Sequence, residues 1–176
     1  MNSNDLSLGL SKIPAGYLKP ELFNQVARLG VLTYLEVLAF RQRKESIEVI
    51  LTKRDSKDPF WPNMYHNPGT VLRPSDTDYS FSDALNRLEK DEYKSKLNTP
   101  FFAGFWFEQL ERGKGLGIVC WVELQNFSAG QYFNVSQLPN NLIKGQSAYI
   151  INAAKQYADY KCGKFNPTPL SQLILQ

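Results

Sequence analysis

The sequence predicts an α+β protein in which helices pack on the faces of a mixed β-sheet. Three observations indicate this class. Segments rich in β-branched and aromatic residues occur close together, amphipathic helical patterns stand singly between them, and 176 residues, 43% of them hydrophobic, suffice for about one compact domain. We therefore expect one principal domain at 31–176, preceded by a segment at 1–30 that contains a short helix.

The amino-terminal part of the chain changes from helix to strand. A helix is expected from Pro20, a residue type favoured in the first helical turn, to a stop at Gly30. Strands are expected at 31–40 and 47–52, because both segments are rich in Val, Leu, Ile and Thr. The polar connection at 41–46 makes these two strands a hairpin.

The central part contains a bent strand and an acidic helix. The strand is expected at 65–72, with a rigid bend at Pro68 and Gly69. Polar residues at 76–80 supply capping groups for an amphipathic helix whose second half is acidic. The apolar positions of this helix recur at helical spacing and are Phe81, Ala84, Leu85 and Leu88.

The carboxyl-terminal part is predicted to form a second hairpin and a final helix. Aromatic and β-branched residues indicate long strands at 101–111 and 116–124, joined by a glycine-containing turn, and a short strand follows around Tyr132. The final helix is expected at 146–161, closed by Gly163.

Charge and cysteine content argue against several classes of protein. The 20 basic and 17 acidic residues leave a net charge of +3, with no basic run longer than 41–44, so nothing indicates nucleic-acid binding. The two cysteines lack the dense spacing of a secreted disulfide scaffold, and no signal peptide or membrane-spanning segment is recognisable. We expect a cytoplasmic protein with no membrane segment, and a homodimer is a candidate assembly.

A short motif combines the bend with the acidic helix: Pro68-Gly69-Thr70, then Asp76, then RLEKDE at 87–92. This order resembles the signature of the Nudix hydrolase family, G-x5-E-x7-R-E-U-x-E-E-x-G-U, in which U is aliphatic and a Pro-Gly-Gly usually opens the motif. The order of elements from about Val31 to Tyr160 also looks like this family. The resemblance implies an α/β/α sandwich with a mixed central sheet.

The resemblance also implies a reaction and its cofactor. Nudix hydrolases cleave the pyrophosphate bond of a nucleoside diphosphate linked to another moiety, and they require Mg²⁺ or Mn²⁺. Hard cations of this kind choose clustered carboxylate oxygens. By resemblance, Asp91 and Glu92 are the catalytic acids and metal ligands, and the Gly69 carbonyl is a further ligand.

Other positions acquire supporting roles from the same resemblance. Asp76 is expected to pair with Arg87 and so to hold the loop and the helix together. Lys53, Arg54 and Trp61 are expected to bind the nucleotide substrate, through charge or ring stacking. Ordinary strand-end charges and a core tryptophan are the alternatives for these three residues.

The motif departs from the family pattern at several positions. Leu88 stands where the family has a glutamate, and ten residues rather than seven separate Asp76 from Arg87. Lys94 replaces a glycine, so the helix is expected to continue past it. Glu89 lies three residues before Glu92, which makes it a candidate replacement ligand on the same helix face.

Three functions therefore remain open. The first is the metal-dependent hydrolase, the second is a Nudix-fold protein that has lost turnover and binds a nucleotide or a protein partner, and the third is an isomerase or other non-hydrolytic member of the family. The missing acid at Leu88 and the acid-free loop at 125–131 favour the second function. A solvated helix face remains the alternative for the acids, and strand packing is the alternative to a catalytic role for His66.

Overall fold

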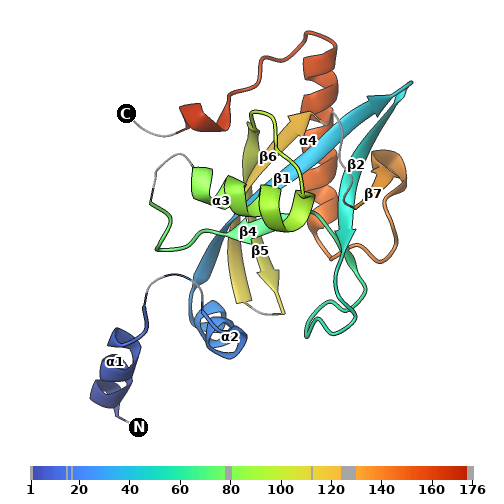
Figure 1. The fold of residues 1–176 in the computed structure, drawn as a ribbon. Coiled ribbons are helices and arrows are strands. Elements are labelled where there is room, and N and C mark those ends of the chain that lie inside the picture. The colour runs from blue at the N-terminus through green and yellow to red at the C-terminus, as the bar shows by residue number, and fades with distance from the viewer. Residues whose placement is uncertain are drawn as a thin grey trace.

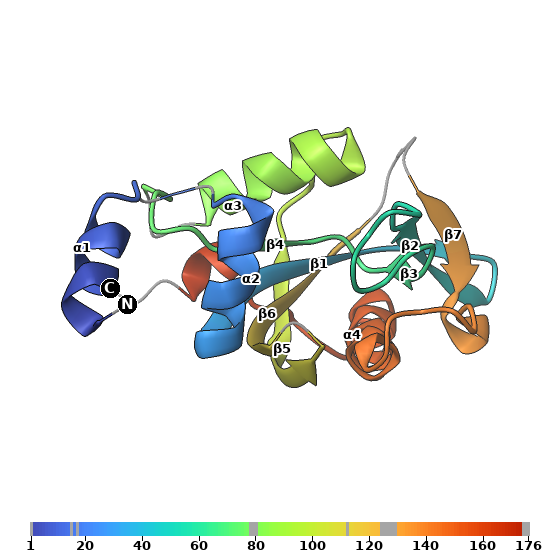
Figure 2. The same ribbon diagram turned by 90° about the horizontal axis from the view of Figure 1, so that it is seen from below.

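The computed structural model describes residues 2–14, 16, 18–77, 81–111, 113–123 and 130–173. Its centre is a mixed seven-stranded sheet (Figure 1). Helix α3 (Ser82–Arg87) lies on one face of the sheet, and helix α4 (Gln146–Lys161) lies on the other (Figure 2). The predicted α+β class, with a mixed sheet between helices, is confirmed.

Strand β1 is the centre of the sheet. It runs parallel to β6 over ten residue pairs, from Val31↔Lys114 to Phe40↔Glu123. Its first half also pairs antiparallel with β4, and its last four residues pair antiparallel with β2. The strands are β1 (Val31–Arg43), β2 (Ser46–Lys53), β3 (Tyr65–His66), β4 (Gly69–Val71), β5 (Phe101–Leu110), β6 (Gly113–Glu123) and β7 (Gln131–Asn134).

Strands β1 and β6 each extend three residues beyond one of their predicted ends. Strand β1 continues to Arg43 because its polar residues are paired across the hairpin, where Arg41 binds Glu48 at 2.5 Å. Strand β6 begins three residues before Leu116, in a segment where glycines weaken the strand signal. Those glycines have a packing role: a Cβ added at Gly115 or Gly117 would lie 2.5 or 2.9 Å from the Tyr34 ring.

The core consists of two clusters separated by the sheet. One cluster lies on the α3 face and contains Leu35, Val37, Ala39, Ile50, Ala84, Leu88, Tyr93, Cys120, Val122 and Leu170. The other lies on the α4 face and contains Leu38, Phe40, Val49, Leu51, Val119, Trp121, Tyr149, Ile150, Ala153, Ala154 and Tyr157. Alternate residues of β1 enter alternate clusters, so this strand is buried on both faces.

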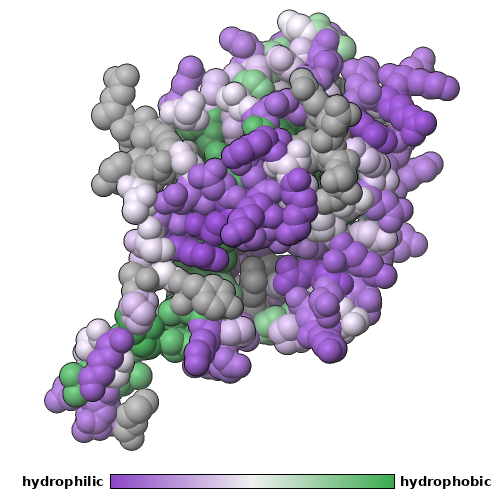
Figure 3. Space-filling view, viewed as in Figure 1, coloured by the Kyte–Doolittle hydropathy of each residue, from purple (hydrophilic) through white to green (hydrophobic). Residues whose placement is uncertain are grey.

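Two helices precede the sheet. Helix α2 (Pro20–Leu29) has the bounds that the sequence predicts, and it packs against β6, with Ala27 fully buried. Helix α1 (Ser3–Ser11), which the sequence pattern did not predict, begins with a capping box between Asn2 and Asp5. None of its residues is buried, and it projects from the body of the protein (Figures 1 and 2). Figure 3 shows hydrophobic residues exposed on this helix.

The acidic segment after α3 is not a regular α-helix. It continues as the π-helix η1 (Leu88–Tyr93), and Lys94 ends it in a left-handed conformation with φ of 53°. The expectation that the helix continues past Lys94 is therefore wrong. Two fully buried side chains, Leu88 and Tyr93, are five residues apart, and a π-helical turn places such residues on one face.

The remaining helical segments are short. They are the 3₁₀ turns η2 (Val135–Gln137) and η3 (Leu170–Gln172). Within the described ranges of the chain, no helix is long and apolar enough to span a membrane.

Candidate functional site

Arg87 connects three parts of the Nudix-like motif. Its guanidinium donates to the Asp76 carboxylate at 2.5 and 3.0 Å and to the carbonyl oxygen of Val71 at 3.0 Å. The hydrogen bonds from Arg87 lower the pKa of Asp76, although partial burial of the carboxyl group opposes this shift. The structure thus brings Asp76 and Arg87 together, and the pair holds β4 and the following loop to α3.

Gly69 leaves space for the side chain of Glu36. It is paired with Glu36 in the β1–β4 register, and a Cβ at this position would lie 2.5 Å from Glu36 Oε1. The absence of a side chain therefore lets the Glu36 carboxylate pack directly over the backbone of β4.

The three acids of the predicted metal site have different surroundings. Asp91 is exposed, whereas Glu92 is half-buried. Burial raises the pKa of Glu92, the positive charge of Arg54 opposes this rise, and the negative charge of Asp91 adds to it. Neither Asp91 nor Glu92 is among the residues that line the cleft beside Arg54.

Glu89 is engaged away from Asp91 and Glu92. Its carboxylate accepts hydrogen bonds from Lys96 Nζ at 2.6 Å and from the backbone N–H of Leu97 at 2.8 Å. The neighbouring Leu88 is fully buried in the core cluster on the α3 face. These two hydrogen bonds fix the position of the Glu89 carboxylate.

The donor chemistry of the remaining residues suits a hard cation. Asp91 and Glu92 supply carboxylate oxygens and Gly69 supplies a carbonyl oxygen, the ligand types that Mg²⁺ and Mn²⁺ prefer. The described part of the chain contains no group of three or more His, Cys, Asp or Glu side chains arranged to hold a metal ion. The two carboxylates and the Gly69 carbonyl are therefore chemically suited to such an ion.

A cleft of about 630 Å³ lies beside the motif. It is bounded by α2, the start of β1, strand β4 and the loop after β2, and Arg54, Phe60, Gly69 and Thr70 are among its lining residues. A smaller pocket of about 100 Å³ shares four residues with it, Arg54, Gly69, Thr70 and Val71. A larger groove, about 1070 Å³, lies between the β1–β2 turn and α4 and contains none of the predicted site residues.

The predicted substrate-binding residues occupy different positions around this cleft. Arg54 lines both the cleft and the pocket and binds Asp58 through two N–H groups, at 2.8 and 2.5 Å. Trp61 lines the pocket, is only 5% exposed and donates through its indole N–H to Glu111 at 2.9 Å. Lys53 is exposed at the end of β2 and lines neither cavity.

Sequence reasoning missed a group of buried polar residues in the smaller pocket. Glu36 and Asn67 are 8% and 1% exposed, and Asn67 Nδ2 donates to Glu36 Oε2 at 2.6 Å. The oxygen of the Gln146 side chain accepts from the Asn67 backbone N–H at 2.7 Å. The available signal was Glu36 itself, a single charge within the apolar run of β1.

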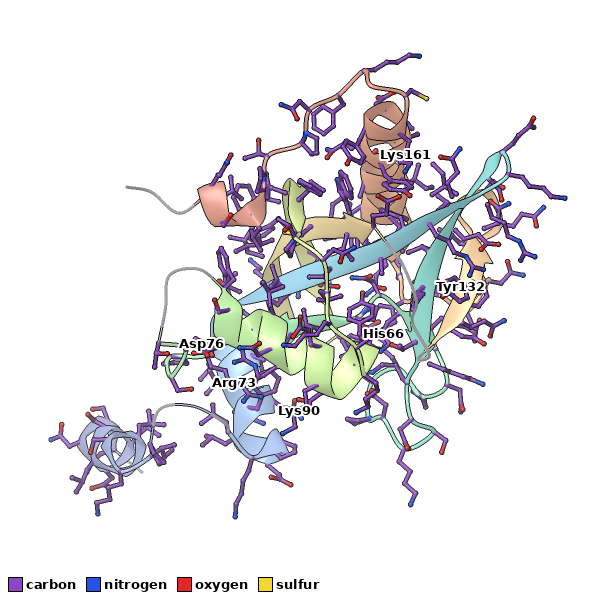
Figure 4. All side chains as sticks on the ribbon, turned by 45° about the horizontal axis from the view of Figure 1, so that its top comes forward. His66, Arg73, Asp76, Lys90, Tyr132 and Lys161 are labelled. Atoms are coloured by element: carbon purple, nitrogen blue, oxygen red, sulfur yellow. The ribbon has the colours of Figure 1, made fainter. Side chains whose placement is uncertain are left out.

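His66 belongs to the wall of the same pocket. Its Nδ1 lies 2.8 Å from the Asn67 carbonyl oxygen and its Nε2 lies 3.0 Å from Thr52 Oγ1. A carbonyl only accepts, so Nδ1 carries the proton and Nε2 accepts from the Thr52 hydroxyl. Figure 4 labels His66 and Asp76, which lie toward opposite ends of the α3–η1 segment. Of the acid-free loop at 125–131 that favoured loss of turnover, residues 125–129 lie outside the described residues.

Comparison with known proteins identifies the fold. No family model and no curated protein matches the sequence. The Nudix domain of Shewanella oneidensis NrtR, complexed with ADP ribose, has a TM-score of 0.59 and 14% identity over 89% of this chain and 99% of that chain. A MutT/Nudix family protein from Enterococcus faecalis has a TM-score of 0.58 and 14% identity, covering 89% of this chain and 69% of that chain.

An enzyme is also among the similar structures. An Ap4A hydrolase of C. elegans has a TM-score of 0.55 and 11% identity over 76% of this chain and 99% of its own. The chain therefore has the Nudix fold, as the resemblance implied. At these identities the likeness concerns the fold, and the chemistry is argued from this chain's own residues.

Proposed function

We propose that the protein is a Nudix-type hydrolase that cleaves the pyrophosphate bond of a nucleoside diphosphate linked to another moiety, with Mg²⁺ or Mn²⁺ as cofactor. One observation carries this proposal. The Arg87 guanidinium joins Asp76 and the Val71 carbonyl to the helical segment that continues into Asp91 and Glu92. The clamp thereby secures β4, which begins at Gly69, to the element that bears the acids.

The cleft supplies the remaining features that a diphosphate requires. The Arg54 guanidinium lines it and carries positive charge beside Gly69 and Thr70. Apolar residues from α2 and β1 cover much of the rest of the cleft, as is common in small-molecule sites. Two of the similar structures support this ligand class, since one holds ADP ribose and another is an Ap4A hydrolase.

The division of roles follows from the surroundings of each residue. Asp91 and Glu92 would hold the cation together with the Gly69 carbonyl, and a bound cation supplies charge neutralisation and activation of water. Arg54 positions the diphosphate, and its charge keeps Glu92 closer to its ionised form despite burial. Asp76 and Arg87 position the loop and the helix and do not contact the substrate.

Replacement of Glu92 by glutamine tests the proposal. We expect purified protein with Mg²⁺ or Mn²⁺ to release nucleoside monophosphate from a panel of nucleoside diphosphate derivatives, and Glu92→Gln to lower kcat by about 100-fold or more because a carboxylate ligand is lost. The matched control is Glu45→Gln, an exposed residue at the β1–β2 turn, which should retain full activity. Absence of turnover across the panel in the unmodified protein would contradict the proposal.

A second function is favoured by the state of Glu89 and Leu88. Glu89 is held by Lys96 and Leu97, and Leu88 is in the core, so two positions of the motif that precede Asp91 are committed to structure. The alternative is a protein that binds a nucleotide in the same cleft without hydrolysing it. Thermal stabilisation by nucleoside diphosphates, with no product formed on prolonged incubation with Mn²⁺, would establish this alternative.

A further inference from the structure

The main cleft of about 630 Å³ has a polar end and an apolar end. The polar end adjoins the small pocket, because Arg54, Gly69 and Thr70 line both cavities. The apolar end is formed by helix α2 and the start of strand β1, which lie side by side (Figure 2). The two ends offer different contacts to a ligand, and this difference indicates which kind of molecule the cleft accepts.

The first step concerns the charged side chains of the cleft. Among its described lining residues these are Arg54, Asp58 and Arg73, and none of them belongs to α2 or β1. Asp58 Oδ2 accepts from two N–H groups of Arg54, at 2.8 and 2.5 Å. A guanidinium has more N–H donors than these two, so Arg54 retains donors for a further anion. A diphosphate is therefore best placed at the polar end, beside Gly69 and Thr70.

The second step concerns the wall that α2 and the start of β1 form. Most of its side chains are apolar, and these are Pro20, Phe23, Val26, Val31 and Leu32. Val26 and Val31 are 39% and 51% exposed, although both are apolar residues of a concave surface. Exposed apolar side chains that gather in a concavity mark a site where a ligand or partner is bound.

The third step compares a sugar with an aliphatic chain as the group that the diphosphate carries. A sugar has several hydroxyls, and each hydroxyl that leaves water without finding a hydrogen-bond partner costs free energy. Among the described lining residues of α2 and β1, only Asn24 and Thr33 have polar side chains. An aliphatic chain needs no such partner, and each methylene that it buries favours binding. The wall therefore favours the aliphatic chain.

We propose that the cleft binds a nucleoside diphosphate whose second moiety is an aliphatic chain, as in a nucleotide-linked lipid. The inference rests on the proposed function, and it names the moiety that hydrolysis would release as its monophosphate ester. The diphosphate lies beside Arg54, Gly69 and Thr70, and the chain extends along α2 and the start of β1. Val26 and Val31 are thus specificity-determining residues of the site.

The test is a series of ligands that differ only in chain length. Dissociation constants are measured by calorimetry in Mg²⁺ for the methyl, butyl and hexyl esters of adenosine α,β-methylenediphosphate, in which the cleavable P–O–P bridge is replaced by P–CH₂–P. Adenosine is chosen because one similar structure holds ADP ribose. Each buried methylene tightens binding by about two- to fourfold, so we expect the hexyl ester to bind at least about tenfold more tightly than the methyl ester. A smaller gain, or no binding of any ester, would overturn the proposal.

A substitution in the wall separates binding of the chain from binding of the nucleotide. Val26→Trp fills part of the cleft with an indole, so we expect the hexyl ester to lose most of its advantage while the affinity of the methyl ester is unchanged. Leu29→Trp is the matched control, because Leu29 lies on the same helix, is 74% exposed and is not a lining residue. Val31→Trp repeats the test on β1 if circular dichroism shows that Val26→Trp is not folded. A folded wall variant that keeps the wild-type ratio would overturn the assignment.

The outcome is distinguishable from that of the proposed hydrolysis. Tighter binding of the hexyl analogue, with no turnover of the ordinary diphosphate esters in Mn²⁺, would support the chain site and remove the hydrolase. Turnover of the methyl and hexyl esters with equal kcat/KM, together with equal affinities of the analogues, would retain the hydrolase and overturn the chain site. Analytical ultracentrifugation tests another occupant: a dimer that Val26→Trp dissociates would assign the wall to a second copy of this chain and overturn the proposal.

Discussion

At the residue scale, acids that are neighbours in the sequence have separate physical roles. Asp91 is exposed, Glu92 is half-buried near the charge of Arg54, and Glu89 binds the Lys96 ammonium and the Leu97 N–H. Burial raises the pKa of Glu92 above its ordinary value of 4.5, so the ionised carboxylate is less favourable in the folded protein than in the unfolded chain. The fold therefore disfavours the ionised form of Glu92 relative to the unfolded chain.

A prediction about stability follows from the direction of that shift. Because the folded-state pKa of Glu92 is raised, its ionisation destabilises the native state at pH 7, and this penalty disappears below about pH 4.5, where the group is protonated in both states. We expect Glu92→Gln to melt at a higher temperature than the wild type at pH 7, and the two proteins to melt together at pH 4. Thermal melts across this range measure the difference; a lower melting temperature at pH 7 would contradict it.

At the element scale, the π-helix η1 determines which side chains of the motif enter the core. Leu88 and Tyr93 both enter the core on the α3 face, and the Tyr93 hydroxyl donates to the Val37 carbonyl of β1. These anchors at the two ends of the segment set the rotation of the residues between them. Lys94 then ends the helix in a left-handed turn, which lets Glu89 accept from the chain that follows.

This arrangement predicts that restoring the family's glutamate would fail. Leu88→Glu removes a fully buried apolar side chain and introduces a carboxylate into the core, so we expect a loss of at least about 3 kcal/mol in the free energy of unfolding and no gain in turnover. Urea denaturation measures the loss. Leu88→Met, which conserves volume, is the control and should lose less than about 1.5 kcal/mol. A stable, more active Leu88→Glu protein would place this residue at the site instead.

At the scale of the whole molecule, the sheet divides the core and the cleft lies at its edge. Strand β1 is buried on both faces, and its pairing with β2, β4 and β6 brings Glu36, Gly69 and the loop after β2 to one place. Helix α2 closes the far side of the cleft and is anchored by the buried Ala27. Helix α1 contributes no buried residue to this body.

Helix α1 buries no residue, whereas α2 is anchored by Ala27, which lies against Gly113, and this difference is testable. Deletion of residues 2–12 should change the free energy of unfolding by less than about 0.5 kcal/mol, because no buried contact is lost. Gly113→Ala should be destabilising by more than about 1 kcal/mol, since its Cβ would lie 2.2 Å from the Ala27 carbonyl oxygen and its φ is +140°. Urea denaturation of both variants checks this; a large loss on deletion of α1 would contradict the independence of the helix.

The sequence predicted most of the elements but only part of the site. The hairpins, α2 and α4 were predictable because their patterns are local: strand-forming residues, a proline at a helix start, apolar residues at helical spacing. The structure also brings Asp76 and Arg87 together, as the resemblance suggested. The pocket around Asn67 was not predictable, because its residues come from distant segments, as in the contact between Asn67 and Gln146, which are 79 positions apart.

The amino-acid sequence by itself determined the order of strands and helices, the bend at Pro68 and Gly69, and the acidic character of the segment after α3. Tertiary structure decided that Glu89 binds Lys96 and Leu97, that Leu88 belongs to the core, and that Glu36 accepts a hydrogen bond from Asn67. The physical reason is the distance along the chain over which each effect acts. Propensity and periodicity act between residues a few positions apart. Burial, unsatisfied acceptors and pKa shifts depend instead on neighbours that only the folded sheet brings together.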